Sequence, residues 1–368
     1  MKVKSALATL EPYRGEISRR ELARRLGLKE DEILPLHANE NLFIEREWVK
    51  ERVLEALEMV DPRMYPDPQN IEVREALAKH YKVREEEVVI GSGADELIDG
   101  ISRCFIDKGE QVVVLEPTFQ VYKISAVLHG GICKSILLKE EDFSIDVPKL
   151  LSELDEKVRV LYICSPNNPT GNQHEREVVR EVIENVNCLV VLDEAYVEFA
   201  DYSLSNLIRD YENLIVLRTF SKAFGMAGLR LGVALSNEEV ANFLRKGLQP
   251  YNVNVIAQYT ALTMLKHWDY VARKIEEIKE QRKILWEKLS EIEGLKVYPS
   301  RANFLLIRIM KKNVSAKKVQ EGLMMKGILV RERSGLPLLD NCLRITVCPS
   351  RGAEKLLSAL KEMLQGEG

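Results

Sequence analysis

Long apolar runs alternate with helical patterns through the middle of the chain. Six of these runs are strand-like, and they span residues 88–92, 111–117, 158–166, 188–196, 214–222 and 231–236. Between several of them apolar residues recur every three or four positions, as over 94–106 and 175–186, which predicts amphipathic helices. Continuous apolar strands that alternate with helices indicate a mostly parallel sheet covered by helices on both faces. The predicted fold class is therefore α/β.

The pattern changes after about residue 260. A long helical stretch over 259–292 is followed by shorter strand-like runs over 303–309, 328–333 and 342–347, and then by a helix over 354–364. This mixture predicts a second, smaller α+β domain. We expect residues 41–260 to form the large domain, residues 261–368 the small domain, and the segment 1–40 to pack with the small domain.

Composition excludes several classes of protein. The chain has 368 residues, 46% of them hydrophobic and 30% charged, with a net charge of −4. This mildly acidic balance argues against a nucleic-acid partner. No apolar run approaches the ~20 residues of a membrane helix, and no signal peptide is apparent, so we expect a cytoplasmic protein without membrane contacts. The six cysteines form no CxxC pair and the five histidines no HExxH spacing, so we expect no metal.

Polar or turn motifs end four of the predicted strands: GSGADE, SPNNPTG, DEAY and SKAF. In open α/β sheets the ligand binds outside the carboxyl ends of the strands. One such motif alone would be an ordinary turn between two elements. Four of them indicate one site.

The stretch RTFSKAFGMAGLRLG places Lys222 in a loop of small residues, with Arg230 eight positions later. Most single lysines are simply exposed. The alternative is an amine that forms a Schiff base with a carbonyl cofactor, with Arg230 on a phosphate. The GSGADE turn would offer free N–H groups of Gly93, Ala94 and Asp95 to a phosphate at a helix N-terminus, although such a glycine turn alone is weak evidence.

The remaining strand ends supply four further candidates. Phe119 in EPTF either stacks on a ligand ring or packs in the core. Asp193 in DEAY is either a turn residue or the partner of a protonated pyridine nitrogen, and Tyr196 and Asn168 could bind the ring oxygen of the same cofactor. Each of these residues has an ordinary explanation when it is taken alone.

The order of these motifs, over nearly the whole chain, resembles the fold-type I enzymes that use pyridoxal 5'-phosphate (PLP), specifically the class I/II aminotransferases. The resemblance implies a homodimer with shared active sites. It implies that Lys222 holds PLP, that Asp193 pairs with the ring nitrogen and that Ser221 and Arg230 hold the phosphate. Asn168 and Tyr196 would contact the ring oxygen. Tyr65, in MYPD, would reach the cofactor phosphate of the neighbouring subunit.

Three segments near the ends of the chain resemble the histidinol-phosphate aminotransferases. These are LEPYRG and LHANEN near the N-terminus and VRERSGLPLLDNCLRITV near the C-terminus. The likeness implies transfer of an amino group between L-histidinol phosphate and 2-oxoglutarate, which yields L-glutamate in histidine biosynthesis. The residues at the substrate end would be Tyr13, Asn39, Arg331 and Arg344.

The sequence departs from that pattern at three places. Phe119 stands where relatives often have tyrosine, ENLFIEREW lacks a Gly-Pro-Ser-Pro segment, and Cys348 replaces a frequent glycine. Alternative functions are therefore an L-threonine-O-3-phosphate decarboxylase or an aromatic or broad-specificity aminotransferase. A non-catalytic effector domain of a transcription regulator is disfavoured by the intact Lys222 and by the short segment that precedes LHANEN.

Overall fold

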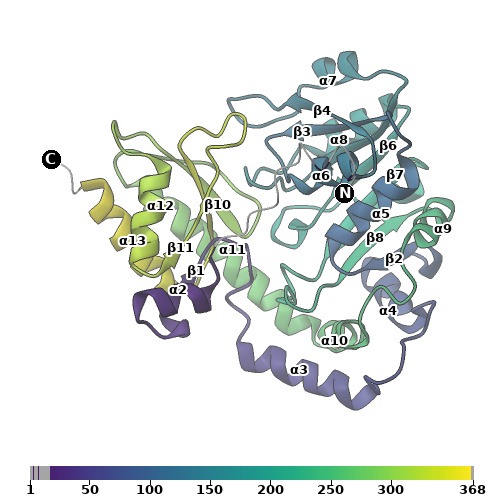
Figure 1. Ribbon diagram of the computed structural model, residues 1–368, viewed down its shortest axis with the longest axis horizontal. Coiled ribbons are helices and arrows are strands. Elements are labelled where there is room, and N and C mark those ends of the chain that lie inside the picture. Colours follow the sequence, from purple (N-terminus) through teal and green to yellow (C-terminus); the bar gives the residue numbers. More distant parts are fainter. Residues whose placement is uncertain (1–2, 4–6, 8–16, 366–368) are drawn as a thin grey trace.

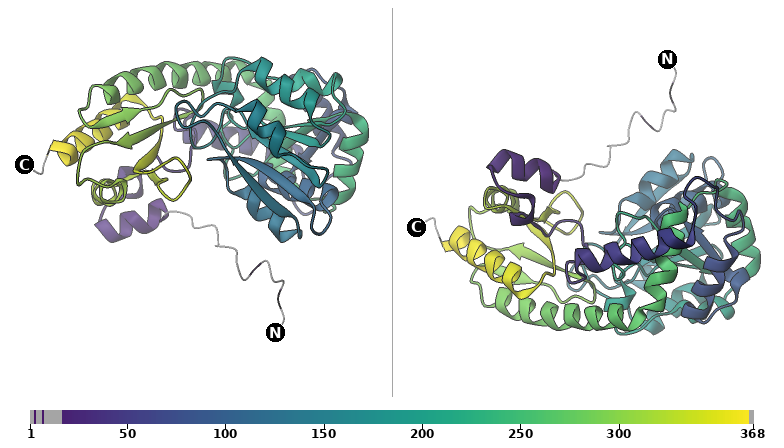
Figure 2. Two further views of the ribbon diagram at one scale, coloured as in Figure 1. Left: turned by 90° about the horizontal axis from the view of Figure 1, so that it is seen from above. Right: turned by 90° about the horizontal axis from the view of Figure 1, so that it is seen from below.

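The computed structural model describes residues 3, 7 and 17–365. It has a larger α/β lobe and a smaller α+β lobe, and the long helix α11 (Trp268–Ser290) runs along both of them (Figures 1 and 2). The N-terminal helix α2 (Arg19–Leu26) lies against the small lobe.

The large lobe is built on a seven-stranded sheet with the order β2-β8-β7-β6-β5-β3-β4. Its strands are β2 (Val88–Gly91), β3 (Gln111–Glu116), β4 (Ile132–Leu137), β5 (Val158–Cys164), β6 (Leu189–Asp193), β7 (Leu214–Thr219) and β8 (Gly232–Ser236). Five neighbouring strands of this sheet, β7, β6, β5, β3 and β4, are parallel to one another. Strand β8 is antiparallel to both of its neighbours, β2 and β7. The predicted mostly parallel α/β sheet is confirmed. Strand β4 was not predicted, because it is a largely exposed edge strand without a continuous apolar run.

Helices cover both faces of this sheet. Alternate residues of β5 enter two different cores: Val160 and Tyr162 face one side, and Leu161 and Ile163 face the other. This alternation explains why the central strands are apolar at nearly every position. Helices α5 (Ala94–Phe105), α6 (Val121–Leu128) and α9 (Glu238–Gly247) contribute to the first core. The other helices of the lobe are α3 (Arg46–Met59), α4 (Ile71–Tyr81), α7 (Val147–Glu153), α8 (Arg176–Asn185) and α10 (Val255–Lys266).

The small lobe contains an antiparallel sheet in the order β12-β13-β10-β9. Its strands are β9 (Leu295–Val297), β10 (Phe304–Ile309), β12 (Arg331–Glu332) and β13 (Cys342–Thr346), and its helices are α12 (Ala316–Met325) and α13 (Ser350–Gln365). The N-terminal strand β1 (Leu34–Pro35) pairs in parallel with β11 (Ile328–Leu329). Short 3₁₀ helices span Glu30–Glu32, Glu85–Glu87, Val197–Phe199 and Ser205–Arg209.

Helix α11 belongs to both hydrophobic cores. Its Val271, Ile275 and Ile278 are buried in the large lobe, and its Leu285 and Leu289 are buried in the small lobe. The transition between the cores therefore falls within this helix, and the domain boundary at residue 260 stays a prediction.

Candidate active site

A cavity of about 360 Å³ lies at the carboxyl ends of the parallel strands, where the small lobe and the segment after β1 face the large sheet. Its lining includes these predicted residues: Asn39, Ala94, Asp95, Phe119, Asn168, Asp193, Tyr196, Ser221, Lys222, Arg230, Arg331 and Arg344. Parallel strands end at one edge of a sheet, so residues from the five loops that follow β2, β3, β5, β6 and β7 meet there.

One end of the cavity is formed by the β2–α5 turn and the loop after β7. Gly93 caps α5 with φ +79°, and a side chain on the neighbouring Gly232 would lie 2.4 Å from its backbone. The expectation that the Gly93 N–H is free is wrong, because it donates to the Gly91 carbonyl at 2.8 Å. The N–H groups of Ala94 and Asp95 remain at the start of a 12-residue helix, which favours an anion there.

Two polar side chains complete this end. Arg230 Nη2 lies 2.8 Å from Asp95 Oδ2, so the guanidinium sits at the helix N-terminus. The buried Ser221 Oγ has no hydrogen-bond partner among the described residues. A buried hydroxyl without a partner is costly, so this group is suited to an oxyanion bound beside Arg230.

Lys222 lines the cavity and lies, partly buried, between the large lobe and the segment after β1. Its Nζ donates to the Ala38 carbonyl at 2.9 Å and lies 5.7 Å from the centre of the Tyr196 ring. Burial, followed by the positive charge of Arg344, lowers the Lys222 pKa to about 8. An amine with this pKa is partly neutral near neutral pH, and only the neutral amine can act as a nucleophile or a base.

Asp193 ends β6 and is buried on the floor of the cavity. Its Oδ2 accepts a hydrogen bond from the Tyr122 hydroxyl at 2.5 Å, and its Oδ1 accepts one from the Ala195 N–H at 3.0 Å. Burial raises the Asp193 pKa to about 6, and the Tyr122 hydrogen bond opposes that rise. A carboxylate held in this way is still ionised at neutral pH and is poised to stabilise a nearby cation.

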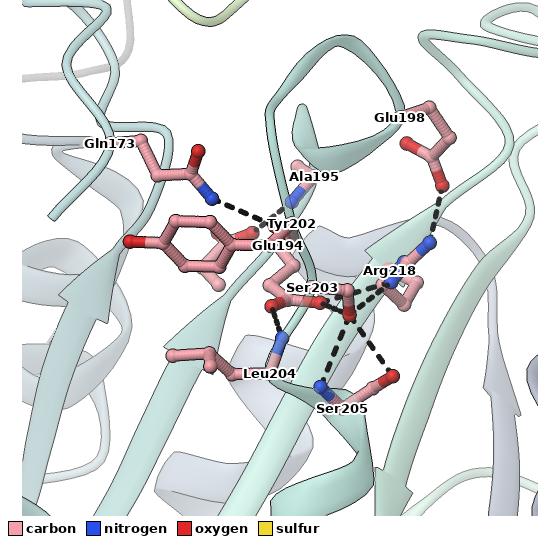
Figure 3. A network of polar contacts seen from close by, with 10 residues as sticks. Gln173, Glu194, Ala195, Glu198, Tyr202, Ser203, Leu204, Ser205 and Arg218 are labelled. Carbon is pink, nitrogen blue, oxygen red and sulfur yellow. Dashed lines mark hydrogen bonds and ion pairs between the residues drawn. The ribbon is translucent and has the colours of Figure 1, made fainter. Parts of the chain in front are cut away.

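A buried ionic cluster holds the loop after Asp193 to strand β7 (Figure 3). Arg218 donates to Glu194 Oε2 at 2.9 Å and to Glu198 Oε1 at 2.7 Å, and Ser203 donates to Glu194 Oε2 at 2.7 Å. Removing one partner of a buried ion pair costs about 3–5 kcal/mol, because the other charge is left uncompensated. The cluster therefore fixes Asp193 and Tyr196 relative to the loop that carries Lys222.

The opposite end of the cavity comes from the small lobe and the N-terminal segment. Arg344 of β13 is buried; its Nη1 donates to Asn168 Oδ1 at 2.6 Å and its Nη2 to the His37 carbonyl at 2.5 Å. Asn39 Nδ2 donates to the Tyr196 hydroxyl at 3.0 Å. The predicted substrate residues Asn39 and Arg344 thus connect directly to the predicted cofactor residues Tyr196 and Asn168.

Arg331 lies directly opposite Arg344 in the β12–β13 pair, although the two are 13 positions apart in sequence. Arg333 also lines the cavity and was not predicted. Its signal was available, because side chains two positions apart on an extended segment face the same side. Three guanidinium groups therefore face one end of the cavity.

Sequence reasoning also missed other residues of the lining, among them Tyr122 and His37. Tyr122 lies in α6, three positions after Phe119. The hydroxyl of Tyr122 reaches Asp193 only in the folded chain. His37 lies in the LHANEN segment, and burial, followed by the charges of Arg344 and Arg331, lowers its pKa to about 4. His37 is therefore neutral at neutral pH and adds no charge to the arginine cluster.

Three of the predicted residues are not among those that line the cavity, and the first is Gly93, which lies directly before Ala94. Tyr13 lies outside the described residues. Tyr65 is 81% exposed and stacks on Tyr251, with 4.6 Å between ring centroids. Its assignment to a neighbouring subunit's site stays a prediction.

The described residues contain no cluster of three or more His, Cys, Asp or Glu side chains that could hold a metal ion. None of the helices described is both long and apolar enough to cross a membrane.

The fold and the site together define the class. The chain belongs to the aminotransferase class I and II family, whose model matches residues 31–360. Enzymes of this family generally depend on PLP.

Within that family the chain groups with the histidinol-phosphate aminotransferases. It is 35% identical to the enzyme of that name from Methanocaldococcus jannaschii, with 99% of this chain and 98% of the relative covered. It is 40% identical to the one from Christiangramia forsetii, with 81% and 85% covered. The crystal structure of histidinol-phosphate aminotransferase from Sinorhizobium meliloti in complex with PLP superimposes with a TM-score of 0.88 at 28% identity, covering 99% of this chain and 98% of that one.

Proposed function

We propose that this protein transfers an amino group between L-histidinol phosphate and 2-oxoglutarate, as a step of histidine biosynthesis. The observation that carries the proposal is the arrangement of two separate cationic ends around Lys222. One end contains Ser221, Arg230 and the α5 N-terminus, and the other contains Arg331, Arg333 and Arg344. The full-length likeness to relatives named for this reaction supports the same substrate pair.

The residues fit PLP. Ser221 Oγ, Arg230 and the α5 N-terminus would hold its phosphate, Asp193 its ring nitrogen and Lys222 its carbonyl carbon, while Phe119 lies in the same lining to cover the ring. When bound, PLP would supply an electron sink for the substrate's α-carbon.

The protein's own groups then have distinct tasks. Arg344 would bind the anionic group of whichever amino donor is present, a carboxylate in glutamate or a phosphate in histidinol phosphate, because a guanidinium binds both in a forked geometry. Lys222, with its lowered pKa, would take up the α-proton and return it at the adjacent position. Because both donors use the same arginine, they would bind in turn, and the kinetics should be ping-pong.

Separate half-reactions test this proposal. In single-turnover experiments, histidinol phosphate should remove the visible absorbance of the PLP-loaded protein, and 2-oxoglutarate should restore it. Threonine phosphate is the matched control, since it carries an amino group and a phosphate but differs in shape. If threonine phosphate released carbon dioxide and the absorbance did not alternate with the two substrates, the protein would instead be a threonine-phosphate decarboxylase.

We also propose that the protein is a homodimer in which Tyr65 serves the partner's site. Tyr65 and the neighbouring Met64 are strongly exposed, and Tyr65 stacks on the exposed Tyr251. Exposed aromatic and apolar side chains that gather at one place are typical of an interface. A second copy of this chain would bury them.

Mixed dimers distinguish action within a subunit from action across the interface. We expect Lys222→Ala and Tyr65→Ala homodimers to be impaired, whereas the mixed dimer should regain activity. If Tyr65 acts on the partner, one of the two mixed sites has both residues intact and the other lacks both. Absence of any recovery, in mixed dimers verified by mass, would contradict the assignment.

A further inference from the structure

A second hollow, of about 430 Å³, lies between helix α11 and the segment that leads into β10. It is lined by Lys279, Arg282, Lys283, Trp286, Pro299, Ser300, Arg301 and Leu305, and we call it the α11 groove. None of these residues lines the active-site cavity. Four of them are cations, none is acidic, and the rest of the wall is mainly apolar.

The cations of the α11 groove are only half compensated. Lys279 pairs with Glu276 at 2.9 Å and Arg301 with Asp201 at 2.6 Å. No carboxylate of the described residues lies within ion-pairing distance of Arg282 or Lys283. Solvated lysines on a helix surface are common, so Lys283 alone does not indicate a binding site.

Arg282 is different because its guanidinium is partly buried. Its Nη1 donates to two carbonyl groups, Phe199 O at 3.0 Å and Ala302 O at 2.8 Å. Burial, followed by the charge of Arg301, lowers the Arg282 pKa to about 10. The charges of Asp201 and Glu276 oppose this shift, but neither carboxylate lies within ion-pairing distance of Arg282, so an anion in the groove would further stabilise the partly buried guanidinium.

The apolar part of the wall is formed by Trp286, Pro299 and Leu305. The indole Nε1–H of Trp286 is itself buried, so Trp286 lines the groove with its apolar ring. An oxyanion beside this wall would supply the negative charge that Arg282 and Lys283 lack among the described carboxylates.

We propose that the α11 groove binds a phosphate group, either as the free ion or as a small monoester whose apolar body rests on Trp286, Pro299 and Leu305. Phosphate is favoured because Arg282 and Lys283 of α11 and Arg301 of the segment before β10 line the groove from two elements, and its oxygens can accept from all three side chains. This site is separate from the proposed catalytic function, and its test does not depend on turnover.

The position of the groove gives such binding a structural consequence. Arg282 bridges Phe199, which follows the Tyr196 loop, and Ala302 of the small lobe. Arg301 N–H donates to the Gly171 carbonyl, in the loop that also carries Asn168, at 2.7 Å. A bound anion would therefore stabilise the joint between the lobes, and the melting temperature should rise with ligand concentration.

Trp286 provides the measurement, because the chain has three tryptophans and only this one lines the groove. The PLP-loaded full-length protein is titrated with inorganic phosphate and with phenyl phosphate, against chloride at matched ionic strength. We expect a saturable change in tryptophan fluorescence that is absent in Trp286→Phe. Tighter binding of phenyl phosphate would assign the apolar wall to the ligand's body, and equal binding would assign the site to phosphate alone.

A pair of charge reversals on one helix gives the control. Lys283→Glu should weaken binding by about tenfold or more, whereas Lys288→Glu, an exposed position of α11 outside the groove, should leave it unchanged. The proposal is overturned if neither probe gives a saturable signal at millimolar concentration. Equal weakening in both variants would also overturn it, because the signal would then report general charge rather than the groove.

Discussion

Replacing Lys222 with alanine is expected to lower turnover by about 10³-fold or more, because the variant lacks both the nucleophile and the proton carrier. The cationic end formed by Ser221, Arg230 and the α5 N-terminus is unchanged in this variant, so PLP should still bind, without a covalent link. The measurement combines steady-state transamination with absorbance of the bound cofactor and the mass of the denatured protein after borohydride reduction.

Lys222→Arg is the matched control. It keeps a positive charge beside Ala38 and Tyr196, but a guanidinium has a pKa too high to serve as a base or to form the covalent link. Both variants should therefore be inactive, and only the wild type should retain cofactor after reduction and denaturation. Normal turnover in Lys222→Ala would refute the assignment of this residue.

Replacing Arg344 with alanine is expected to lower kcat/KM by about 10²-fold or more for histidinol phosphate and for glutamate alike. The shared loss follows from the proposal that one guanidinium receives the anionic group of both donors. Its measurement is the rate of each half-reaction at several substrate concentrations, which separates weakened binding from slower chemistry.

Arg344 also donates to Asn168 and to the His37 carbonyl, so a folding defect has to be separated from a substrate effect. Cofactor affinity and melting temperature of the variant provide that separation. Arg344→Lys keeps the charge but loses the fork, and it should fall between the wild type and the alanine variant. Normal affinity of Arg344→Ala for both substrates would contradict the proposal that Arg344 binds their anionic groups.

Much of the fold could be predicted because the central strands are buried on both faces. Such strands must be apolar at nearly every position, and this pattern is visible locally, as in Leu214–Thr219. The edge strand Ile132–Leu137 escaped prediction because one side of it has no neighbouring strand and most of its residues stay partly exposed. The antiparallel direction of β8 could not be predicted either, since an apolar run does not show whether a strand is parallel or antiparallel to its neighbours.

The α/β class and the set of strand-end residues around Lys222 could be inferred from the sequence alone, because the carboxyl ends of parallel strands necessarily share one edge. The Tyr122–Asp193 hydrogen bond, the contact of Arg344 with Asn168, and the contacts of Arg282 with the Phe199 and Ala302 carbonyl groups arise only in the folded structure. Local sequence patterns record which side of an element is buried. Contacts between distant elements depend on how those sides pack against one another, and they appear only when the chain is folded.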